Sequence, residues 1–554
     1  MSKTQQKLLL AGLMLGVLLE GLDSTILSTA MPRIVSDLNG LALISWVFTA
    51  YMLTSVVITP IYGKLSDLYG RKPFYLGGMA LFIVASMVVG QAQSMEWLIF
   101  WRGVQGLGAG AMMPIAHSII SDVFSGASNG RAQAAVGAGF VLSSLIGPFL
   151  GGWLTDGPGW RWAFYINAPL GLIVIGLMLA IKLPATSGSQ GRNGKAQIDY
   201  LGAASLMLTT LALLLGFVFG GDATLGWLHP QTLAMFGLAL IGLVGFLLIE
   251  KRAADPILPL AFLKNPVFVV LSLAGLLIGA IQYVALNYTA LFVQGVQGNT
   301  ATSSGTAITP LMLAMVVGLF AGGHALGHLG KYKALVIFFV GMMALGMFQM
   351  TLLNAGSSSL QLIVAMATVG FGFGGSFPVF IIALQNAFPT RFMGTLNSLN
   401  DFYRLMGGAV GTSILGSVLT ASLTSQVSSK LAGLNIPGVK LDVQVLTSSE
   451  GLSSLQQRLG NTELYNQVTG GLREALADSL HLVFTGGLIV SLVALVAVFF
   501  LKEVPLRWKP TGMHGHAGAG HHAGPHHAGQ HEHQQEGEGQ LEPVAGHGGH
   551  VSFH

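Results

Sequence analysis

Long runs of apolar residues recur along almost the whole chain, and they constrain its fold more than any other feature of the sequence. A helix that crosses a bilayer needs roughly 20 apolar residues at a rise of about 1.5 Å each, and each run is about that long. Only 9% of the residues are charged. The sequence therefore predicts an all-α membrane protein with fourteen transmembrane helices, at about 8–31, 43–62, 73–92, 97–119, 131–154, 162–182, 199–220, 230–250, 266–294, 305–327, 334–353, 360–385, 400–425 and 480–501.

The distribution of lysine and arginine predicts the orientation of these helices. Basic residues cluster in alternate loops, whereas the short loops on the other side hold only Arg33 and Arg161. Cytoplasmic loops carry the excess of basic residues, and an even number of spans returns the chain to its starting side. We therefore expect a monomer in the cytoplasmic (inner) membrane of a bacterium, surrounded by lipid bilayer, with both termini in the cytoplasm.

Two breaks in composition divide the chain. Residues 184–198 are polar and rich in glycine and serine, and three prolines fall between residues 253 and 266. Two six-helix halves are typical of transporters built from internal repeats, with the substrate site between the halves. The predicted parts are an N-terminal half at 1–183, linkers and two extra central helices at 184–265, a C-terminal half at 266–510 that includes an outer segment at 426–479, and a tail at 511–554.

The tail is rich in glycine and holds eleven of the sixteen histidines. It cannot bury apolar surface, so we expect it to be disordered. One interpretation is a solvated segment without a ligand, and the other is weak capture of divalent metal ions by its imidazoles. No specific metal site and no cofactor are predicted elsewhere.

Several classes of function are excluded by missing patterns. The basic residues are dispersed, which argues against nucleic-acid binding, and the absence of cysteine excludes thiol catalysis. The spans hold no nucleophile–base pair and no metalloprotease motif, and no phosphate-binding loop for ATP occurs. We therefore expect no enzyme and an ion gradient as the energy source. A membrane enzyme or metal sensor that uses the tail is the remaining alternative, and deletion of residues 512–554 would test it.

Two carboxylates, Glu20 and Asp23, lie inside the first predicted helix. Each costs roughly 2.5 to 3.5 kcal/mol at the bilayer centre, and at this spacing both share one helix face that must avoid lipid. Arg102, in the fourth predicted helix, lies at a similar depth, so its expected partner is Asp23 or Glu20. A nearby guanidinium favours the carboxylate and burial favours the acid, so a moving arginine can switch proton affinity. The alternative is a structural pair that only orients helices.

Two other motifs predict helix geometry. Gly63, Asp67, Gly70, Arg71 and Lys72 lie in a tight turn between the second and third helices, called here the latch loop, residues 63–72. Its basic residues also satisfy the positive-inside rule on their own, so a pure topology signal is the alternative. In the fifth helix, Pro148 predicts a bend, with glycines for close packing and a pivot at Gly147, Gly151 and Gly152.

The second half carries polar and aromatic residues at depth but, by this reading, no deep carboxylate. Large flat side chains with a few polar groups suit a permissive pocket for amphipathic cargo, although ordinary helix packing is the alternative. Asp401 and Arg404 are placed at the cytoplasmic start of helix 400–425, so charge chemistry is expected only in the first half. With Glu20, the predicted substrate residues are Gln282, Tyr283, Asn287, Tyr288, Phe377 and Gln385.

An ordered set of motifs resembles the fourteen-span drug:proton antiporter branch of the major facilitator superfamily, over residues 8 to 502. They are LDSTILSTAMP at 22–32, GKLSDLYGRK at 63–72, RGVQGLGAG at 102–110, GAGFVLSSLIGPFLGG at 137–152, WRWAFYINAP at 160–169 and RLMGGAVG at 404–411. The resemblance implies the major facilitator fold. It also implies a latch in which Asp67 holds the halves shut, and an exporter motif around Pro148.

The same resemblance implies that Asp23 and Arg102 couple transport to protons. Glu20 lies outside the shared motif and is open to a second role, the recognition of a cationic substrate. The predicted function is thus a proton-coupled antiporter that exports lipophilic, cationic small molecules by alternating access, with protonation from outside and release inside. The alternative is an exporter of the same fold for an endogenous lipid, siderophore or metabolite.

Overall fold

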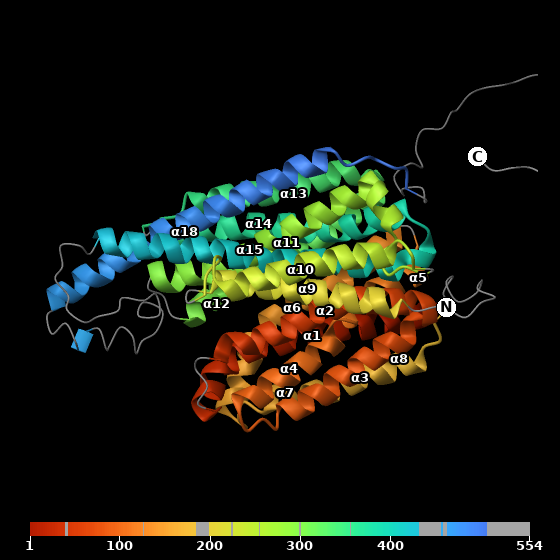
Figure 1. The fold of residues 1–554 in the computed structure, drawn as a ribbon, viewed down its shortest axis with the longest axis horizontal. Coiled ribbons are helices and arrows are strands. Elements are labelled where there is room, and N and C mark those ends of the chain that lie inside the picture. Colours follow the sequence, from red (N-terminus) through yellow and green to blue (C-terminus); the bar gives the residue numbers. More distant parts are fainter. Residues whose placement is uncertain are drawn as a thin grey trace, which may run out of the picture. The chain divides into compact units, whose positions relative to one another are not determined.

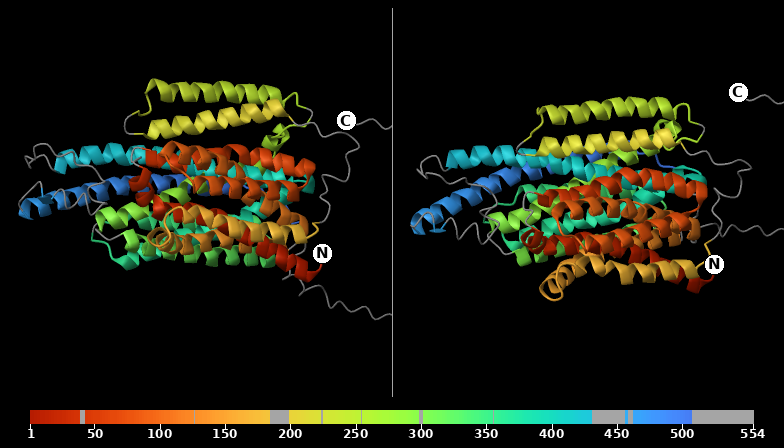
Figure 2. Two further views of the ribbon diagram at one scale, coloured as in Figure 1. Left: turned by 90° about the horizontal axis from the view of Figure 1, so that it is seen from below. Right: turned by 60° about the horizontal axis from the view of Figure 1, so that its bottom comes forward.

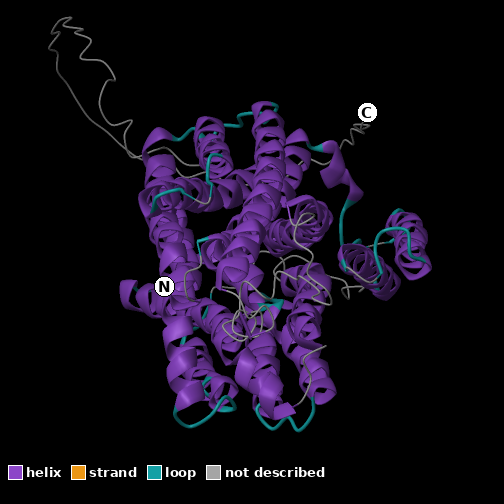
Figure 3. Cartoon of the chain, turned by 90° about the vertical axis from the view of Figure 1, so that its left-hand side faces the viewer, coloured by secondary structure: helices purple, strands orange, loops and turns teal. Residues whose placement is uncertain are grey.

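The computed structural model of this chain describes residues 1–38, 43–125, 127–183, 199–222, 225–253, 255–297, 301–354, 356–430, 456–457 and 462–506. Within these ranges every regular element is a helix, in agreement with the predicted all-α class (Figure 3). The predicted linker 184–198 and the histidine-rich tail 511–554 lie outside the described residues. So does most of the outer segment 426–479, although its two ends are continuations of long helices.

The first half of the chain forms helices that lie together in the lower part of Figure 1. Their ends follow simple chemistry where a cap is formed; Ser94, for example, accepts a hydrogen bond from the Trp97 amide at the start of α4. The helices are α1 (Lys3–Leu38), α2 (Ile44–Tyr69), α3 (Arg71–Val89), α4 (Met95–Ala109), α5 (Met112–Val123), α6 (Ala127–Asp156), α7 (Trp162–Tyr165) and α8 (Asn167–Ala180).

The rest of the chain forms two connecting helices and a second group. Asn265 caps α11 with Pro266 at the first helical position, and Ser358 and Gln361 form a capping box at α14. The elements are α9 (Tyr200–Gly221), α10 (Pro230–Glu250), η2 (Leu260–Lys264), α11 (Pro266–Leu291), the π-helical turn η3 (Phe292–Val296), α12 (Ala301–Leu329), α13 (Tyr332–Thr351), α14 (Ser359–Ala387), η4 (Thr390–Phe392), α15 (Met393–Lys430) and α18 (Thr462–Phe499).

Twelve helices of the described chain are long and apolar enough to cross a membrane, and the bent α6 makes thirteen. The remaining predicted span, 97–119, is divided between α4 and α5 at Gly110 and Ala111, so neither piece reaches the necessary length. The count of fourteen therefore stays a prediction. The N-terminus and the end of α18 lie at the same end of the bundle, as an even count requires (Figure 1).

The two halves meet along two seams. In one, α6 of the first half packs on α12 and α14; in the other, α2 and α5 pack on α15.

Within the second half, the close approach of α12 and α14 depends on glycine, because a Cβ at Gly322 would collide with the Gly375 backbone and one at Gly374 with the Met315 carbonyl. Such small residues are the means by which helices associate in lipid.

The extra helices α9 and α10 form a hairpin on the flank of the bundle (Figure 2). The inner helix of the hairpin, α9, packs against both α2 and α15, so it covers the second seam. Leu214 lies in one apolar cluster with Leu53 and Phe402, and the Trp227 indole donates a hydrogen bond to Ser417 Oγ at 3.0 Å. The hairpin therefore touches both halves of the molecule.

Candidate functional site

Asp23 and Arg102 form a buried ion pair between α1 and α4. Their exposed fractions are 2% and 1%, and an Arg102 amino group donates to the Asp23 carboxylate. Gln105 and Asn167 each donate to Asp23 Oδ1 at 2.8 Å, and Arg102 also donates to Gln105 Oε1 at 2.8 Å. The Arg102 guanidinium further lies over the Tyr51 ring, 4.2 Å from its centroid. The sequence-based expectation of an Asp23–Arg102 contact is confirmed; its role in proton coupling stays a prediction.

This arrangement gives the buried pair several hydrogen-bond partners. Three donors surround one carboxylate, which compensates part of the cost of removing the charges from water. Loss of one partner would leave an uncompensated charge, at a cost of about 3 to 5 kcal/mol. The pair is thus stable only while both members are present and in contact.

Glu20 lies about one helical turn before Asp23 but has different neighbours. Its Oε2 atom is buried and has no hydrogen-bond partner. Its electrostatic neighbours are Asp401 and Arg404 of α15, in addition to Asp23. Asp23 therefore belongs to a pair inside the first half, whereas Glu20 faces the second half across the interface.

The structure corrects the placement of Asp401 and Arg404. Helix α15 begins at Met393 rather than at residue 400, so Asp401 lies about 12 Å along the helix at a rise of about 1.5 Å per residue. Asp401 is 2% exposed and Arg404 is 9% exposed. The expectation that the second half holds no deep carboxylate was wrong, because the predicted span starts seven residues later than the helix.

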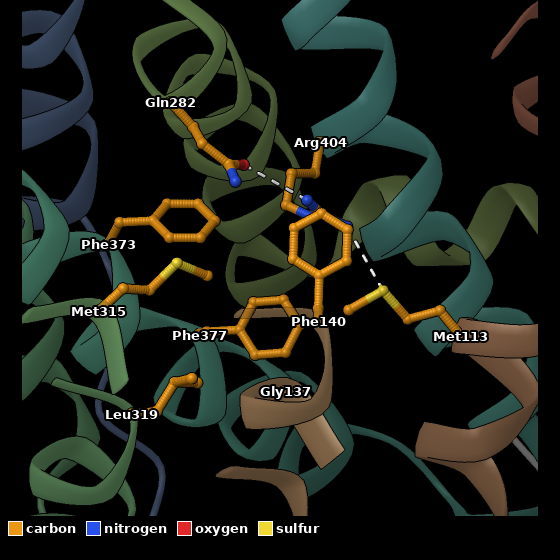
Figure 4. A pocket seen from close by; sticks show the side chains of 9 residues that line it. All are labelled: Met113, Gly137, Phe140, Gln282, Met315, Leu319, Phe373, Phe377 and Arg404. Atoms are coloured by element: carbon orange, nitrogen blue, oxygen red, sulfur yellow. Dashed lines mark hydrogen bonds between the residues drawn. The ribbon is translucent and has the colours of Figure 1, made fainter. Parts of the chain in front are cut away.

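A small pocket lies between the halves, next to Arg404 (Figure 4). The Arg404 guanidinium points toward Gln282 Oε1 at 3.4 Å and toward Met113 Sδ at 3.7 Å. The volume is about 20 Å³, which is room for roughly one water molecule. The complete lining is Met113, Gly137, Phe140, Gln282, Met315, Leu319, Phe373, Phe377 and Arg404.

Two of the predicted substrate residues, Gln282 and Phe377, line this pocket. The Tyr283 ring packs against Gly408, and the Tyr288 hydroxyl donates to the Thr412 carbonyl at 3.1 Å, so both lie against α15. Asn287 is exposed. Of these five predicted substrate residues, two line the pocket, two pack α11 against α15, and one is exposed.

Gln385, the last predicted substrate residue, is committed to a network of uncharged side chains between the halves. It donates to Asn397 at 3.0 Å and accepts from Asn129 at 3.2 Å. From Asn129 the hydrogen bonds continue through Gln133 to His117 of α5, and from Asn397 they continue to Ser118 of α5. This interface network, which sequence reasoning missed, consists of His117, Ser118, Asn129, Gln133, Gln385 and Asn397.

The structure corrects the predicted turn at the latch loop: Gly63 and Asp67 lie inside α2, which ends at Tyr69, and only Gly70 separates α2 from α3. Asp67 links α2 to the start of α15. Asp67 is buried and accepts hydrogen bonds from the Gly394 amide at 2.8 Å, the Thr395 amide at 2.7 Å and the Thr395 hydroxyl at 2.8 Å. It also pairs with Arg71, whose Nε donates to Asp122 at 3.2 Å. Asp67 thus satisfies free amides at the first turn of α15, where the helix dipole also favours a negative charge.

The remaining residues of the latch loop serve the same junction. A Cβ at Gly63 would collide with Ser398 of α15, so glycine allows α2 and α15 to approach. Gly70 has a φ of 100°, a backbone conformation that favours glycine. Lys72 donates to the Ile181 carbonyl at 2.7 Å and so ties the loop to the end of α8. The end of the bundle that carries these contacts is called the latch end below.

The predicted bend in the fifth span is present, because α6 turns by 43° between Gly147 and Phe149. A Cβ at Gly147 would meet Thr25, and one at Gly151 would meet Thr29, so both glycines pack against α1. Gly152 faces open space. Bend and close packing agree with the sequence, whereas a hinge function stays a prediction.

No cluster of three or more metal-binding side chains occurs in the described part of the chain.

Known proteins with similar sequences are transporters. The family model described as Major Facilitator Superfamily matches residues 13–412. The Multidrug transporter protein MdtP of Bacillus subtilis (strain 168) is 36% identical over 522 residues, which cover 91% of this chain and 94% of that protein. Multidrug resistance protein 3 of the same strain is 32% identical over 501 residues, 90% of this chain and 96% of that protein.

Solved structures agree on the fold. The human organic anion transporter MFSD10 (TETRAN) superimposes with a TM-score of 0.59 at 16% identity, covering 89% of this chain and 99% of that one. The proton:xylose symporter XylE gives a TM-score of 0.57 at 13% identity, covering 91% of this chain and 97% of that one. At these identities the likeness concerns the fold alone.

Proposed function

The chain belongs to the Major Facilitator Superfamily and is a membrane transporter rather than an enzyme, and we propose that it is a proton-coupled antiporter that exports lipophilic, cationic small molecules. Two relatives with multidrug names, aligned over nine-tenths of the chain, support multidrug efflux. The membrane is the cytoplasmic membrane of a bacterium. Both termini are cytoplasmic in this proposal, so the latch end is the cytoplasmic end.

The observation that carries the proposal is the buried Asp23–Arg102 pair. A titratable carboxylate in the first helix of the transporter is held by one cation and two amides, Gln105 and Asn167. Separation of the pair raises proton affinity, and re-formation of the pair expels the proton. One proton that moves inward down a potential of about 100 mV supplies about 2.3 kcal/mol, which offsets the cost of moving one monovalent cation outward, so at a one-to-one ratio the pH gradient supplies the energy for accumulation.

The pocket beside Arg404 is the proposed cargo site. Its aromatic and methionine side chains are polarisable and adapt to ligands of different shape, and Glu20 and Asp401 provide negative charge nearby. Ligand pockets for drug-sized molecules measure roughly 300 to 1,000 Å³, far more than the present volume of about 20 Å³. The halves must therefore separate to admit cargo, which is the motion that alternating access requires.

The test is transport of fluorescent lipophilic cations into inverted membrane vesicles with an imposed pH gradient. We expect the native chain to accumulate dye only with the gradient and Asp23→Asn to lose uphill accumulation. Asp156→Asn, a change at an exposed carboxylate at the end of α6, is the matched control and should transport like the native chain. Sodium-dependent flux that ignores the pH gradient would contradict proton coupling.

A further inference from the structure

Buried polar atoms without a hydrogen-bond partner gather at one place between the two halves. Buried polar atoms without a partner are rare in native proteins, so a group of them at one place calls for a functional explanation. The atoms belong to α1, α2, α5 and α15 and are connected by electrostatic contacts. They are Glu20 Oε2, Tyr51 Oη, His117 Nε2, Asp401 Oδ1, Asp401 Oδ2 and Arg404 Nε.

His117 is held in one tautomer by its neighbour in α6. Its Nδ1 lies 2.5 Å from Gln133 Oε1, while Gln133 Nε2 donates to the His117 carbonyl and to Asn129 Oδ1, each at 3.2 Å. This orientation of the amide makes its oxygen face the ring, so His117 Nδ1 carries the proton and donates it. The lone pair of Nε2 is therefore free, and that nitrogen is buried and unpartnered.

Asp401 is a carboxylate without donors. The cation closest in sequence, Arg404, has a nitrogen 3.7 Å from Oδ1, too far for a hydrogen bond. The His117 ring is an electrostatic partner of both Asp401 and Arg404, and it contacts the Phe377 ring of the pocket at 5.4 Å between centroids. A free imidazole lone pair and a free carboxylate thus lie beside the proposed cargo site.

The site holds two carboxyl groups, Glu20 and Asp401, and one guanidinium, Arg404. The other buried charges nearby are already paired, Asp23 with Arg102 and Arg71 with Asp67 and Asp122. The titratable and charged groups on the helices packed around it include Glu20 and Asp23 of α1, Tyr51, Lys64 and Asp67 of α2, Arg71 of α3, Arg102 of α4, Asp122 of α5, Arg131 of α6, Tyr283 of α11 and Arg404 of α15.

We propose that Asp401 and His117 together form a second proton-binding site, distinct from the Asp23–Arg102 pair and located in the interface between the halves. The inference rests on the proposed function as a proton-coupled antiporter. One proton binds to Asp401 or to His117 Nε2, and either form leaves the cluster one charge more positive. The bound proton removes the negative charge that a monovalent cationic cargo needs. Proton and cargo therefore exclude each other here, and more than one proton is exchanged per transport cycle.

The first test counts carboxyl protonation without any cargo. The full chain in detergent is titrated with pH while infrared spectra record the band of protonated carboxyl groups. We expect Asp401→Asn to lose one protonation step that Asp401→Glu retains, and His117→Gln to move the midpoint of that step. The matched controls are Asp156→Asn and His481→Gln, whose side chains are exposed, and both should keep the native titration. An unchanged titration in Asp401→Asn would overturn the proposal.

The second test measures the proton count in liposomes, with tetraphenylphosphonium as the cargo probe and a pH-sensitive dye inside. We expect the ratio of protons to probe to fall by about one in Asp401→Asn relative to Asp401→Glu. An equal ratio in both variants would also overturn the second site. Absence of pH-driven flux in the native chain would instead reject the proposed function, and the infrared titration still decides whether Asp401 and His117 share a proton.

Discussion

At the scale of single residues, the two acidic side chains inside the membrane-spanning part of α1, Asp23 and Glu20, have different hydrogen-bond environments. Asp23 receives hydrogen bonds from Arg102, Gln105 and Asn167, whereas Glu20 Oε2 receives none. The Asp23 carboxylate is thus held by side chains of the first half, whereas one oxygen of Glu20 is left unpartnered at the interface. Two carboxyl groups three residues apart on one helix thus differ: Asp23 is paired, and Glu20 has an unpartnered oxygen.

The Asp23–Arg102 pair permits a test that separates stability from coupling. Arg102→Ala should lower the free energy of unfolding by about 3 to 5 kcal/mol, because Asp23 is left as an uncompensated buried charge. The double variant Asp23→Asn/Arg102→Gln should recover most of that loss but no uphill transport. Thermal unfolding in detergent and dye accumulation in vesicles measure the two effects. Full transport by the double variant would show that the pair is only structural.

A pH prediction belongs to Lys430, beyond the membrane-spanning part of α15. Its ammonium donates to Asp478 at 2.7 Å and to Glu474 at 3.3 Å in α18, and the hydrogen bond to Asp478 raises the pKa of Lys430 above its usual 10.5. A raised pKa stabilises the fold below the usual value and loses that effect as pH rises through the higher one. Lys430→Gln should therefore cost at most about 1 kcal/mol at neutral pH and nothing at strongly alkaline pH, as thermal unfolding can measure.

At the scale of helices, the latch loop explains why α15 begins where it does. The first turn of α15 is capped by Asp67, a residue 327 positions before Gly394. Such a cap is supplied by the fold and not by neighbouring residues, so it leaves no local trace in the sequence. The same contact joins the two halves, so the start of α15 and the closure of the latch end are one interaction.

Asp67→Asn should therefore open the latch end. The neutral amide keeps its size but loses the charge that stabilises both Arg71 and the first turn of α15. The natural chain has no cysteine, so Lys182→Cys and Lys333→Cys give spin labels at two chosen positions only. We expect their distance distribution to shift to longer values in Asp67→Asn and to stay unchanged in Asp156→Asn. An identical distribution in all three proteins would favour the topology-signal interpretation.

At the scale of the whole molecule, the halves are closed around a pocket far smaller than a drug. Contacts at the latch loop, the interface network and the α6–α12 seam all hold them together. Besides these polar and glycine-dependent contacts, one buried apolar cluster contains residues of both halves. The structure thus has the form of a closed state that can open.

Alternating access can be tested by locking the α6–α12 seam. Gly130 and Gly323 face each other across this seam, because a Cβ at Gly130 would lie 3.5 Å from the Gly323 Cα and one at Gly323 would lie 2.9 Å from the Gly130 carbonyl oxygen. Oxidation of Gly130→Cys/Gly323→Cys should abolish transport, and a reducing agent should restore it. The two single variants treated with the same oxidant are the controls. Native transport rates in the fully cross-linked protein would reject alternating access.

Much of this architecture could be predicted because its signals are local. Apolar runs located the helices, and lone charges inside them located Asp23 and Arg102. The interface network could not be predicted, because uncharged polar residues are common in membrane helices and Asn129 and Gln385 are 256 positions apart. Asp401 was misplaced because a charge beside an apolar run resembles a span boundary. Contacts made only by the folded chain explain the remaining differences.

The hairpin of α9 and α10 has a consequence for the direction of movement. Since α9 packs on both α2 and α15, the halves cannot part along that seam without stripping α9 from one of them. Among the described residues, the extensive contacts of α9 outside the hairpin are with α2 and α15 and not with α6 or α12. In the proposed alternating-access motion, the halves therefore rotate about an axis near α9, and the mouth opens on the flank away from the hairpin.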